Sequence, residues 1–422
     1  MHRLALRHCS KRAALHSSKL IPDHRLGLRD RLLRPTRRGY ESQPPLTFRL
    51  PRSLRILSTS DKGAGPTIRS GRETGLVKGA SVIWADSCSL SLQRRAGIYW
   101  ENGRPGRAFL VKKANSKAAA EKLKEIAEWL IAQDVQVFVE RGVHRNEMAE
   151  YQPFDPAKGE VDFCVTLGGD GTVLHLASLF VEDEPLPPVV SFAMGTLGFL
   201  TPFDVDDFAT CLQRVLGANE KPVFCTLRTR RRCEVFWEGK LQRVHHVLNE
   251  CLIDRGASPN MVTLEAFVDG HHITTVQADG LIMATPSGST AYSMSAGGPM
   301  VAPSVPSTLL TPIAPHSLSF RPLVVPESSQ IQILLPSSAR AHARASFDGR
   351  HTMRMLKDSS VRCTTSSCAL PMINLGRLDR DWYEGIVQKL KWNEPLRPGQ
   401  QSTALQSLDF EPTGWSGEWP SD

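Results

Sequence analysis

Long apolar runs are absent from this chain of 422 residues, although 41% of the residues are hydrophobic. No stretch approaches the ~20 consecutive apolar residues that a membrane-spanning helix requires, so no membrane partner is expected. The nine cysteines are scattered and odd in number, and none forms a Cys-x-x-Cys pair. The cysteines therefore indicate neither a zinc-finger site nor a disulfide framework, and a reducing compartment is expected. The length suffices for two domains.

Excess charge is absent from most of the chain. Residues 1–60 hold 14 Lys and Arg against 3 Asp and Glu, whereas the other 362 residues hold 37 basic and 40 acidic side chains. The net charge of +8 therefore comes from the N-terminal segment. Because the rest is nearly neutral, binding of nucleic acid is not expected.

Acidic residues are scarce in the N-terminal segment, which is rich in Arg, Ser and Leu. This composition is typical of a transit segment for a mitochondrion or plastid. The alternatives are a disordered basic tail of a cytoplasmic protein, or upstream coding sequence. Residues 1–100 show little periodicity and are predicted to be mostly disordered, as is the tail 396–422.

Strands and helices alternate over residues 104–220. Apolar, β-branched stretches at 108–112, 135–139, 161–167 and 189–192 predict strands, and helices are expected after Asn115 or Ser116, after the glycines at 168–171, and over 208–216. Alternation of this kind predicts an open, Rossmann-like parallel sheet with ligands at the C-terminal ends of its strands.

Strands follow one another without helices over residues 221–375. Hairpins are expected around Glu238-Gly239, Asp269-Gly270 and Asp348-Gly349. The fold class is therefore α/β, with a parallel-sheet N-terminal domain and a β-rich C-terminal domain. A terminal amphipathic helix, 381–392, with Trp382, Ile386, Val387 and Leu390 on its inward face, is expected to pack back on the first domain.

The sequence Gly168-Gly169-Asp170-Gly171-Thr172 joins a predicted strand to a predicted helix. Glycines there let the backbone approach a ligand closely, and the start of a helix adds positive potential, which suits a phosphate chain. A carboxylate would repel phosphate unless it binds Mg²⁺ or accepts a proton from a nucleophile, so Asp170 is a candidate catalytic base. The alternative is an ordinary β-turn.

A second polar group lies in the β-rich domain. Asn249-Glu250, expected at the end of a strand, offers an amide for an adenine edge and a carboxylate for ribose hydroxyls. A strand after Asp279 runs into Thr285-Pro286-Ser287-Gly288-Ser289-Thr290-Ala291-Tyr292, where hydroxyls, glycine and a flat aromatic face suit a nucleoside. A polar surface loop is the alternative interpretation of the same residues.

These motifs, in this order, resemble those of the NAD kinases. The segments Gly195–Thr201 and Leu310–Pro322 also fit the pattern, and the resemblance covers about Ala108 to Asn393. It implies transfer of the γ-phosphoryl group of ATP to the 2′-hydroxyl of the adenosine ribose of NAD, with Mg²⁺ or another divalent cation, in a homo-oligomer.

The resemblance also implies roles for single residues, and it assigns none of them to the cation. Asp170 would be the base. NAD would bind to Gly171, Asn249, Glu250, Asp279, Ser287, Thr290, Ala291, Tyr292 and Ser295, and ATP phosphates to Gly168, Gly169, Gly171, Thr172 and Asp348.

Two other functions are compatible with parts of the pattern. A lipid kinase would share the glycine loop, but it would need an acyl channel or a membrane-binding patch, and no such apolar stretch stands out. A catalytically silent NAD(P)-binding regulator would share the nucleotide motifs, although the intact Asp170 argues against it.

Overall fold

The computed structural model describes most of the chain between residues 95 and 392. The described residues are 54–57, 95–100, 103–155, 161–180, 185–218, 223–374 and 380–392. The contacts between residues divide the chain into two units, Met1–Pro45 and Leu46–Asp422, and all described residues belong to the second unit. The predicted transit segment lies outside the described residues except for two strands, and the predicted tail 396–422 lies outside them entirely.

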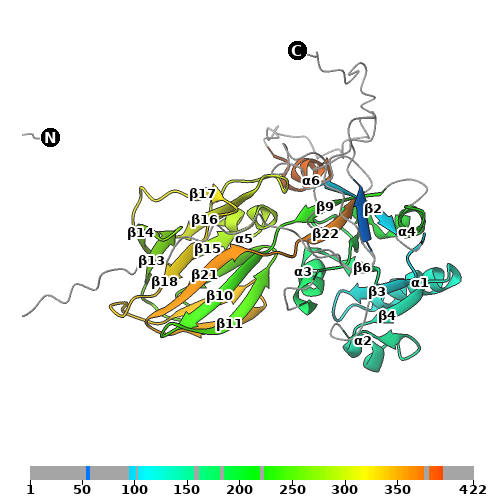
Figure 1. The fold of residues 1–422 in the computed structure, drawn as a ribbon, viewed down its shortest axis with the longest axis horizontal. Helices are drawn as coiled ribbons and strands as arrows, with labels where there is room; N and C mark the ends of the chain where they lie inside the picture. The colour runs from blue at the N-terminus through cyan, green and yellow to red at the C-terminus, as the bar shows by residue number, and fades with distance from the viewer. Residues whose placement is uncertain are drawn as a thin grey trace, which may run out of the picture. The chain divides into compact units, whose positions relative to one another are not determined.

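Ten strands form the first sheet, and its centre is parallel as predicted (Figure 1). The order is β1 (Leu54–Leu57), β2 (Arg95–Trp100), β9 (Val223–Arg228), β22 (Leu370–Asn374), β7 (Val189–Ala193), β6 (Phe163–Gly168), β3 (Arg107–Lys112), β4 (Gln136–Val139) and β5 (Gln152–Pro153), with β8 (Phe203–Asp204) beside β7. The pairs from β22 through β5 are parallel, whereas β1, β2, β9 and β22 pair antiparallel.

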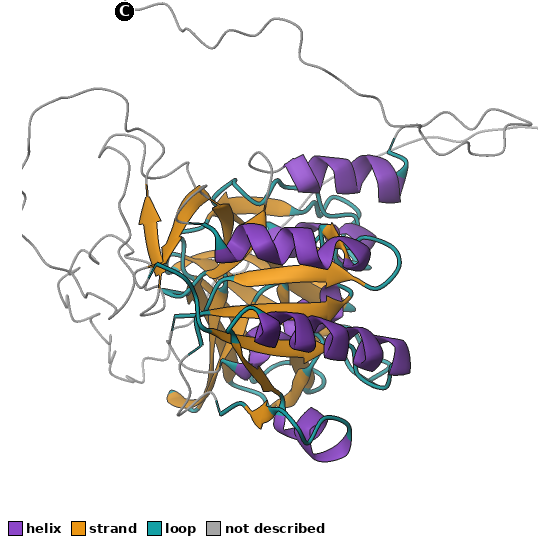
Figure 2. Cartoon of the chain, turned by 90° about the vertical axis from the view of Figure 1, so that its right-hand side faces the viewer, coloured by secondary structure: helices purple, strands orange, loops and turns teal. Residues whose placement is uncertain are grey.

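Helices cover both faces of this sheet. Along β3, Ala108 and Leu110 pack with α1 (Lys117–Ala132) and α4 (Phe208–Leu216), whereas Phe109 and Val111 pack with α3 (Asp170–Leu179). Because successive side chains of a strand face opposite sides, a continuous apolar run is what a strand covered on both faces needs. Figure 2 shows the helices flanking the strands.

The beginning of α1 follows from its sequence. Ser116 is the N-cap, and its side chain accepts a hydrogen bond from the backbone N–H of Ala119. A short helix that the sequence did not predict, α2 (Arg141–Asn146), follows β4. It has no buried residue, so it lacks the apolar periodicity that marks a helix in a sequence.

The antiparallel extension of the sheet adds detail to two predictions. Within residues 1–100, which are predicted to be mostly disordered, β2 pairs with β9 and the indole of Trp100 donates to the carbonyl of Val215. Strands β9 and β22, at the two ends of the predicted β-rich domain 221–375, complete the first sheet. Local pattern shows where strands are, but not which strands they pair with.

The remaining strands form two antiparallel sheets of six strands each, which enclose a second apolar core. One sheet has the order β11 (Lys240–Val247), β10 (Arg231–Trp237), β21 (Ser359–Thr365), β18 (Ile331–Leu334), β13 (Val262–Val268) and β14 (His271–Ala278). The other has the order β17 (Leu323–Pro326), β16 (Ser307–Ile313), β15 (Gly280–Ala284), β12 (Glu250–Asp254), β19 (Ala343–Phe347) and β20 (His351–Met355). The β-rich character is therefore confirmed.

The three predicted hairpins are present. Glu238-Gly239, Asp269-Gly270 and Asp348-Gly349 all have positive φ at both residues, which the Gly in each pair adopts at no steric cost. Two 3₁₀ turns, Val205–Asp207 and Ser287–Thr290, and the short helix α5 (Tyr292–Ser295) complete the described elements.

The terminal helix α6 (Arg380–Leu390) packs back on the first domain, as predicted. Trp382 and Ile386 are buried, and Gly385 lies against the ring of Phe199, in the segment between β7 and β8. Val387, which was expected to face inward, is exposed. Among the described residues no helix is both long enough and apolar enough to cross a membrane.

Candidate active site

The glycine loop has the strand–turn–helix form that its sequence predicts. Strand β6 ends at Gly168, Gly169 is the N-cap, and α3 begins at Asp170. The N–H of Thr172 bonds to the carbonyl of Gly169, which closes the first turn. The loop thus places the positive end of a helix at the C-terminal edge of the parallel strands, where open α/β sheets bind ligands.

Asp170 is held in place by the segment after β7. Its Oδ2 accepts from the N–H of Phe199 at 3.0 Å, and its Oδ1 accepts from the N–H of Leu200 at 2.9 Å. A Cβ at Gly198 would lie only 1.8 Å from Oδ1, so this close approach requires glycine. A carboxylate has about four acceptor positions, so Asp170 is oriented and can still accept from a ligand.

The two polar motifs of the β-rich domain lie together, as predicted. The N–H of Thr285 bonds to the carbonyl of Asn249 at 2.8 Å, and a Cβ at Gly288 would lie 2.2 Å from that same oxygen. Glycine at 288 therefore lets the Ser287–Thr290 turn rest directly on the backbone of Asn249. Within the turn, the hydroxyl of Thr290 donates to the carbonyl of Ser287.

Asp348, at the tip of the β19–β20 hairpin, fixes this part of the site. Its carboxylate accepts from three backbone N–H groups, those of Leu248 at 2.7 Å, Asn249 at 2.8 Å and Glu250 at 3.0 Å. Burial raises the pKa of Asp348, although the three N–H donors act in the opposite direction. Glu250 begins strand β12, whereas the sequence suggested that Asn249-Glu250 ends a strand.

Two buried oxygen atoms in this cluster lack partners. Among the described residues, Asn249 Oδ1 and Glu250 Oε2 have no hydrogen-bond donor. Burial, with a smaller contribution from the charge of Asp348, raises the pKa of Glu250 to about 8. A buried acceptor without a donor costs roughly 1–3 kcal/mol, so two such atoms on consecutive residues indicate a ligand with donor groups.

Arginine side chains connect the glycine loop with the β-rich cluster. Arg350, beside Asp348 in the hairpin tip, donates to the carbonyl of Gly171 and to Nδ1 of His175. Arg228 donates to the hydroxyl of Ser287 and to the carbonyl of Phe199, both at 3.5 Å. The glycine loop and the Asn249–Glu250 cluster therefore belong to one site.

Lys389 of α6 is a charged residue near this site that the sequence interpretation missed. Its Nζ lies 4.1 Å from the centroid of the Phe199 ring and, among the described residues, has no hydrogen-bond partner. Burial lowers the pKa of Lys389, and the charge of Asp170 acts in the opposite direction. The helical spacing at 381–392 marked an inward face, but sequence alone could not show that this face meets Asp170.

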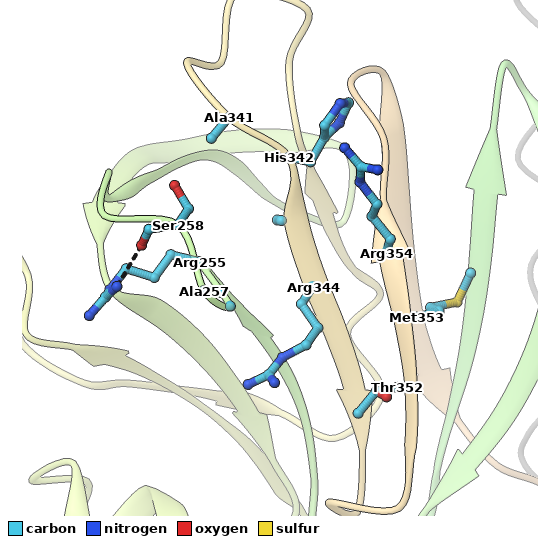
Figure 3. Close-up of a pocket in the computed structure, with 11 residues that line it drawn as sticks. Arg255, Ala257, Ser258, Ala341, His342, Arg344, Thr352, Met353 and Arg354 are labelled. Carbon is cyan, nitrogen blue, oxygen red and sulfur yellow. Dashed lines mark hydrogen bonds between the residues drawn. The ribbon is translucent and has the colours of Figure 1, made fainter.

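Asp279 is not brought into the same cluster. It precedes β15, whereas Thr285 follows β15, so at ~3.3 Å per residue the two ends lie roughly 17–20 Å apart. Its carboxylate accepts from Arg255 Nε at 2.8 Å. Arg255 also lines a pocket of about 570 Å³ together with His342, Arg344 and Arg354 (Figure 3).

Two further predicted residues are solvent-exposed. Tyr292 is 43% exposed, and Ser295 is exposed one turn later in α5. Both follow the Ser287–Thr290 turn directly, so their side chains are accessible to a ligand bound at that turn.

Comparison with known protein families agrees with this arrangement. Residues 108–220 match the ATP-NAD kinase N-terminal domain, and residues 248–375 match the ATP-NAD kinase C-terminal domain. The chain belongs to the ATP-NAD kinase family. The two matched ranges contain the glycine loop and the Asn249–Tyr292 cluster, respectively.

Relatives in this family come from plants and fungi. The chain is 41% identical over 314 residues to "NAD kinase 2, chloroplastic" of Arabidopsis thaliana, a match that covers 71% of this chain and 32% of that protein. It is 36% identical over 318 residues to "Uncharacterized kinase C3H5.11" of Schizosaccharomyces pombe, covering 68% of this chain and 79% of that protein. The chain thus spans about a third of the length of the Arabidopsis relative.

The fold is also similar to a solved structure in the family. Yeast NADH kinase, crystallised in complex with NADH, superposes with a TM-score of 0.69 at 29% identity, covering 84% of this chain and 98% of that one. An α/β domain followed by a β-rich domain is therefore the architecture that this chain shares with an NADH kinase.

Proposed function

We propose that the chain is an NAD kinase, which transfers the γ-phosphoryl group of ATP to the 2′-hydroxyl of the adenosine ribose of NAD and produces NADP. One observation carries this proposal: the buried, unpartnered Asn249 Oδ1 and Glu250 Oε2 lie in the same site as the Asp170 glycine loop. Amino and hydroxyl groups of an adenosine can supply the missing donors. The family membership supports the same reaction.

In this proposal Asp170 is the catalytic base. A sugar hydroxyl is a poor nucleophile at neutral pH, and a positioned carboxylate can take its proton as the oxygen attacks phosphorus. The N–H groups of Phe199 and Leu200 fix the orientation of the carboxylate and leave acceptor positions for the hydroxyl. The γ-phosphorus–oxygen bond to ADP breaks as the new bond forms, and ADP leaves.

The phosphates of ATP would lie against Gly168–Thr172, where backbone N–H groups and the start of α3 face a ligand. Arg350 and Lys389 are cations that can approach the transferred group, since one contacts Gly171 and the other is close to Phe199. We infer that Asp348 does not bind phosphate itself. Because its oxygens hold three N–H groups, its role is to position Asn249 and Glu250.

A divalent cation such as Mg²⁺ fits this site as a companion of ATP. Mg²⁺ in nucleotide sites is usually held by substrate phosphates and one or two carboxylates. When bound, the ion would neutralise charge on the phosphates, and Asp170 is the carboxylate of the loop that could hold it.

The remaining predicted contacts to NAD stay part of the proposal. Ser287, Thr290, Ala291, Tyr292 and Ser295 would surround the adenosine half. Asp279, at the other end of β15, would contact NAD near its nicotinamide end. The homo-oligomer is a separate part of the proposal, and light scattering of the purified chain tests it: a monomer would contradict it.

Localisation in an organelle is proposed from the composition of residues 1–60 and from the chloroplastic relative. A fusion of residues 1–100 to a fluorescent protein tests it. Cytosolic fluorescence would contradict the proposal.

The activity is tested with the purified full chain, NAD, ATP and Mg²⁺. NADP is detected with an NADP-specific dehydrogenase, and ³¹P NMR assigns the new phosphate to the 2′-position. The expected result is NADP formation that requires ATP and the cation. Binding of NAD without any product would favour a silent regulator, and the absence of NAD binding would reopen the lipid-kinase interpretation.

A further inference from the structure

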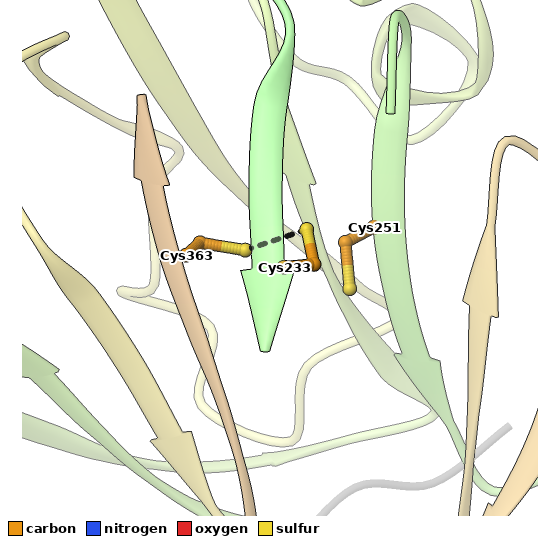
Figure 4. A group of neighbouring side chains, drawn as sticks. All are labelled: Cys233, Cys251 and Cys363. Carbon is orange, nitrogen blue, oxygen red and sulfur yellow. Dashed lines mark hydrogen bonds between the residues drawn. The ribbon is translucent and has the colours of Figure 1, made fainter. Parts of the chain in front are cut away.

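A cluster of three cysteines lies inside the β-sandwich, and one of them, Cys251, directly follows the site residue Glu250. Cys233 on β10, Cys251 on β12 and Cys363 on β21 are fully buried, and their three sulfur atoms lie within 4.8 Å of one another (Figure 4). Two of the strands belong to one sheet and the third to the facing sheet. The cluster therefore spans the core between the two sheets.

We propose that these three sulfurs bind one soft, thiophilic metal ion, specifically Cu(I), which links the two sheets of the sandwich. Thiolates prefer soft ions such as Cu(I), and hard ions such as Mg²⁺ prefer oxygen. The three sulfurs need little movement to meet one ion, because sulfur ligands at ~2.3 Å from a metal lie roughly 4 Å apart in a trigonal arrangement.

The number and surroundings of the ligands favour Cu(I) over Zn²⁺. Zinc sites are almost always tetrahedral and need a fourth ligand or a water molecule. Among the described residues, no fourth His, Cys, Asp or Glu joins the cluster, and its neighbours Val235, Ile253 and Val361 belong to an apolar core. Such surroundings give a water molecule few polar partners.

A buried positive charge next to the cluster suits an anionic metal–thiolate centre. Arg231 is fully buried, and its guanidinium donates to the carbonyl oxygens of Glu327, Ser329 and Cys363 and to the hydroxyl of Thr365. Cu(I) with two thiolates and one thiol would leave one excess negative charge, which Arg231 balances.

A disulfide between Cys233 and Cys363 is the competing interpretation. Their sulfurs are 3.0 Å apart, and the residues are directly opposite in the antiparallel β10–β21 pair. Opposite Cβ atoms in such pairs lie roughly 4.5–5.5 Å apart, however, whereas a disulfide brings them to ~3.8 Å. A disulfide between Cys233 and Cys363 would not involve the third thiol, that of Cys251, whereas a metal ion would bind all three sulfurs, so we favour the metal.

The test measures metal bound to the full chain. Protein is exposed under anaerobic conditions to Cu(I) as its acetonitrile complex or, separately, to Zn²⁺, dialysed against a competing chelator, and analysed by elemental mass spectrometry. We expect about one copper per chain, at least a tenfold loss in Cys233→Ala, Cys251→Ala and Cys363→Ala, and no loss in Cys211→Ala. Cys211 is a matched control because it is also buried, but in α4.

A second measurement uses the unmodified chain, so its result does not depend on whether the variants fold. X-ray absorption at the copper edge should show three sulfur ligands. Absence of copper with all thiols titratable after unfolding would overturn the proposal and leave three small core residues. If the mass of the metal-free chain is lower by two hydrogens, a disulfide is present and the proposal is overturned. If the chain retains zinc instead of copper, the choice of Cu(I) is overturned.

Discussion

At the scale of single residues, the two site carboxylates differ because their surroundings differ. Asp170 accepts two backbone N–H groups from the Phe199–Leu200 segment and is partly exposed. Glu250 is more buried, lies beside Asp348, and has an oxygen without a donor among the described residues. Asp170 is therefore suited to receive a proton in the reaction, whereas Glu250 is suited to bind a donor group.

Gly198→Ala should disturb catalysis by displacing Asp170. The new Cβ would lie 1.8 Å from Asp170 Oδ1 and 2.3 Å from Thr201 Oγ1, so the carboxylate must move. Misplacement of a catalytic group by about 1 Å costs on the order of 100-fold, and we expect a loss of that size in kcat. Gly142→Ala in α2 is the control, because its Cβ would meet open space. Equal turnover of both variants would contradict the geometry.

Lys389→Met should lower kcat by about 10-fold, because it removes a partly buried cation near Asp170 and the phosphate loop while keeping a long apolar side chain at this position. The control is Lys391→Met, one residue beyond the end of α6, where the side chain is exposed. Steady-state kinetics with NAD and ATP measures kcat for both variants. An unchanged kcat in Lys389→Met would remove this residue from the reaction.

Glu250 should make the folded state less stable as pH rises. Its pKa is about 8 in the folded chain against 4.5 unfolded, so the folded state binds this proton more tightly. The contribution of this proton to the free energy of unfolding is fully present below pH 4.5 and is lost as the pH rises towards 8. The free energy of unfolding changes by a few kcal/mol over this range. Urea midpoints at pH 5.5 and 7.5 should differ less in Glu250→Gln than in the wild type. Exposed Glu121→Gln is the control, and an unchanged pH dependence in Glu250→Gln would be evidence against this assignment.

At the scale of elements, the β19–β20 hairpin is the connection between the two halves of the site. Asp348 holds the turn before β12, and Arg350 contacts Gly171 and His175 at the start of α3. His175 in turn bonds to Glu140 at the end of β4 at 2.6 Å. A three-residue tip therefore positions two segments, Leu248–Glu250 and Gly171–His175, that are 73 to 79 residues apart in the sequence.

Arg350→Ala should reduce kcat/KM by about 10- to 100-fold, because hydrogen bonds from a charged group are worth roughly 1.5–3 kcal/mol. Arg354→Ala, an exposed residue on β20 of the same hairpin, should leave the reaction near the wild-type rate. If Arg354→Ala is affected as strongly as Arg350→Ala, the hairpin acts through general stability and not through its contact with the glycine loop.

At the scale of the whole molecule, local signals predicted the elements better than their arrangement. The glycine loop, the helix 208–216 and the three hairpins follow from periodicity and turn residues, and the structure has them. The antiparallel addition of β2, β9 and β22 could not be predicted, because strand order depends on long-range pairing.

The same limit applies to the candidate site. Asp170 could be identified from the glycine turn that contains it, and Asn249 and Glu250 because an amide and a carboxylate suit an adenosine. Arg228, Arg350 and Lys389 could not be identified as neighbours, since they approach the site from β9, from the hairpin tip and from α6. Only folding brings these three cations to one place.

The most direct test of the account compares NAD binding and NADP formation in Asp170→Asn. Asparagine keeps the size of the side chain and one oxygen acceptor, but it is a far weaker base than a carboxylate. The account predicts that NAD affinity stays within a few-fold of wild type while kcat falls by at least 100-fold. Turnover comparable to wild type, with NAD still bound, would contradict the assignment of Asp170 as the base.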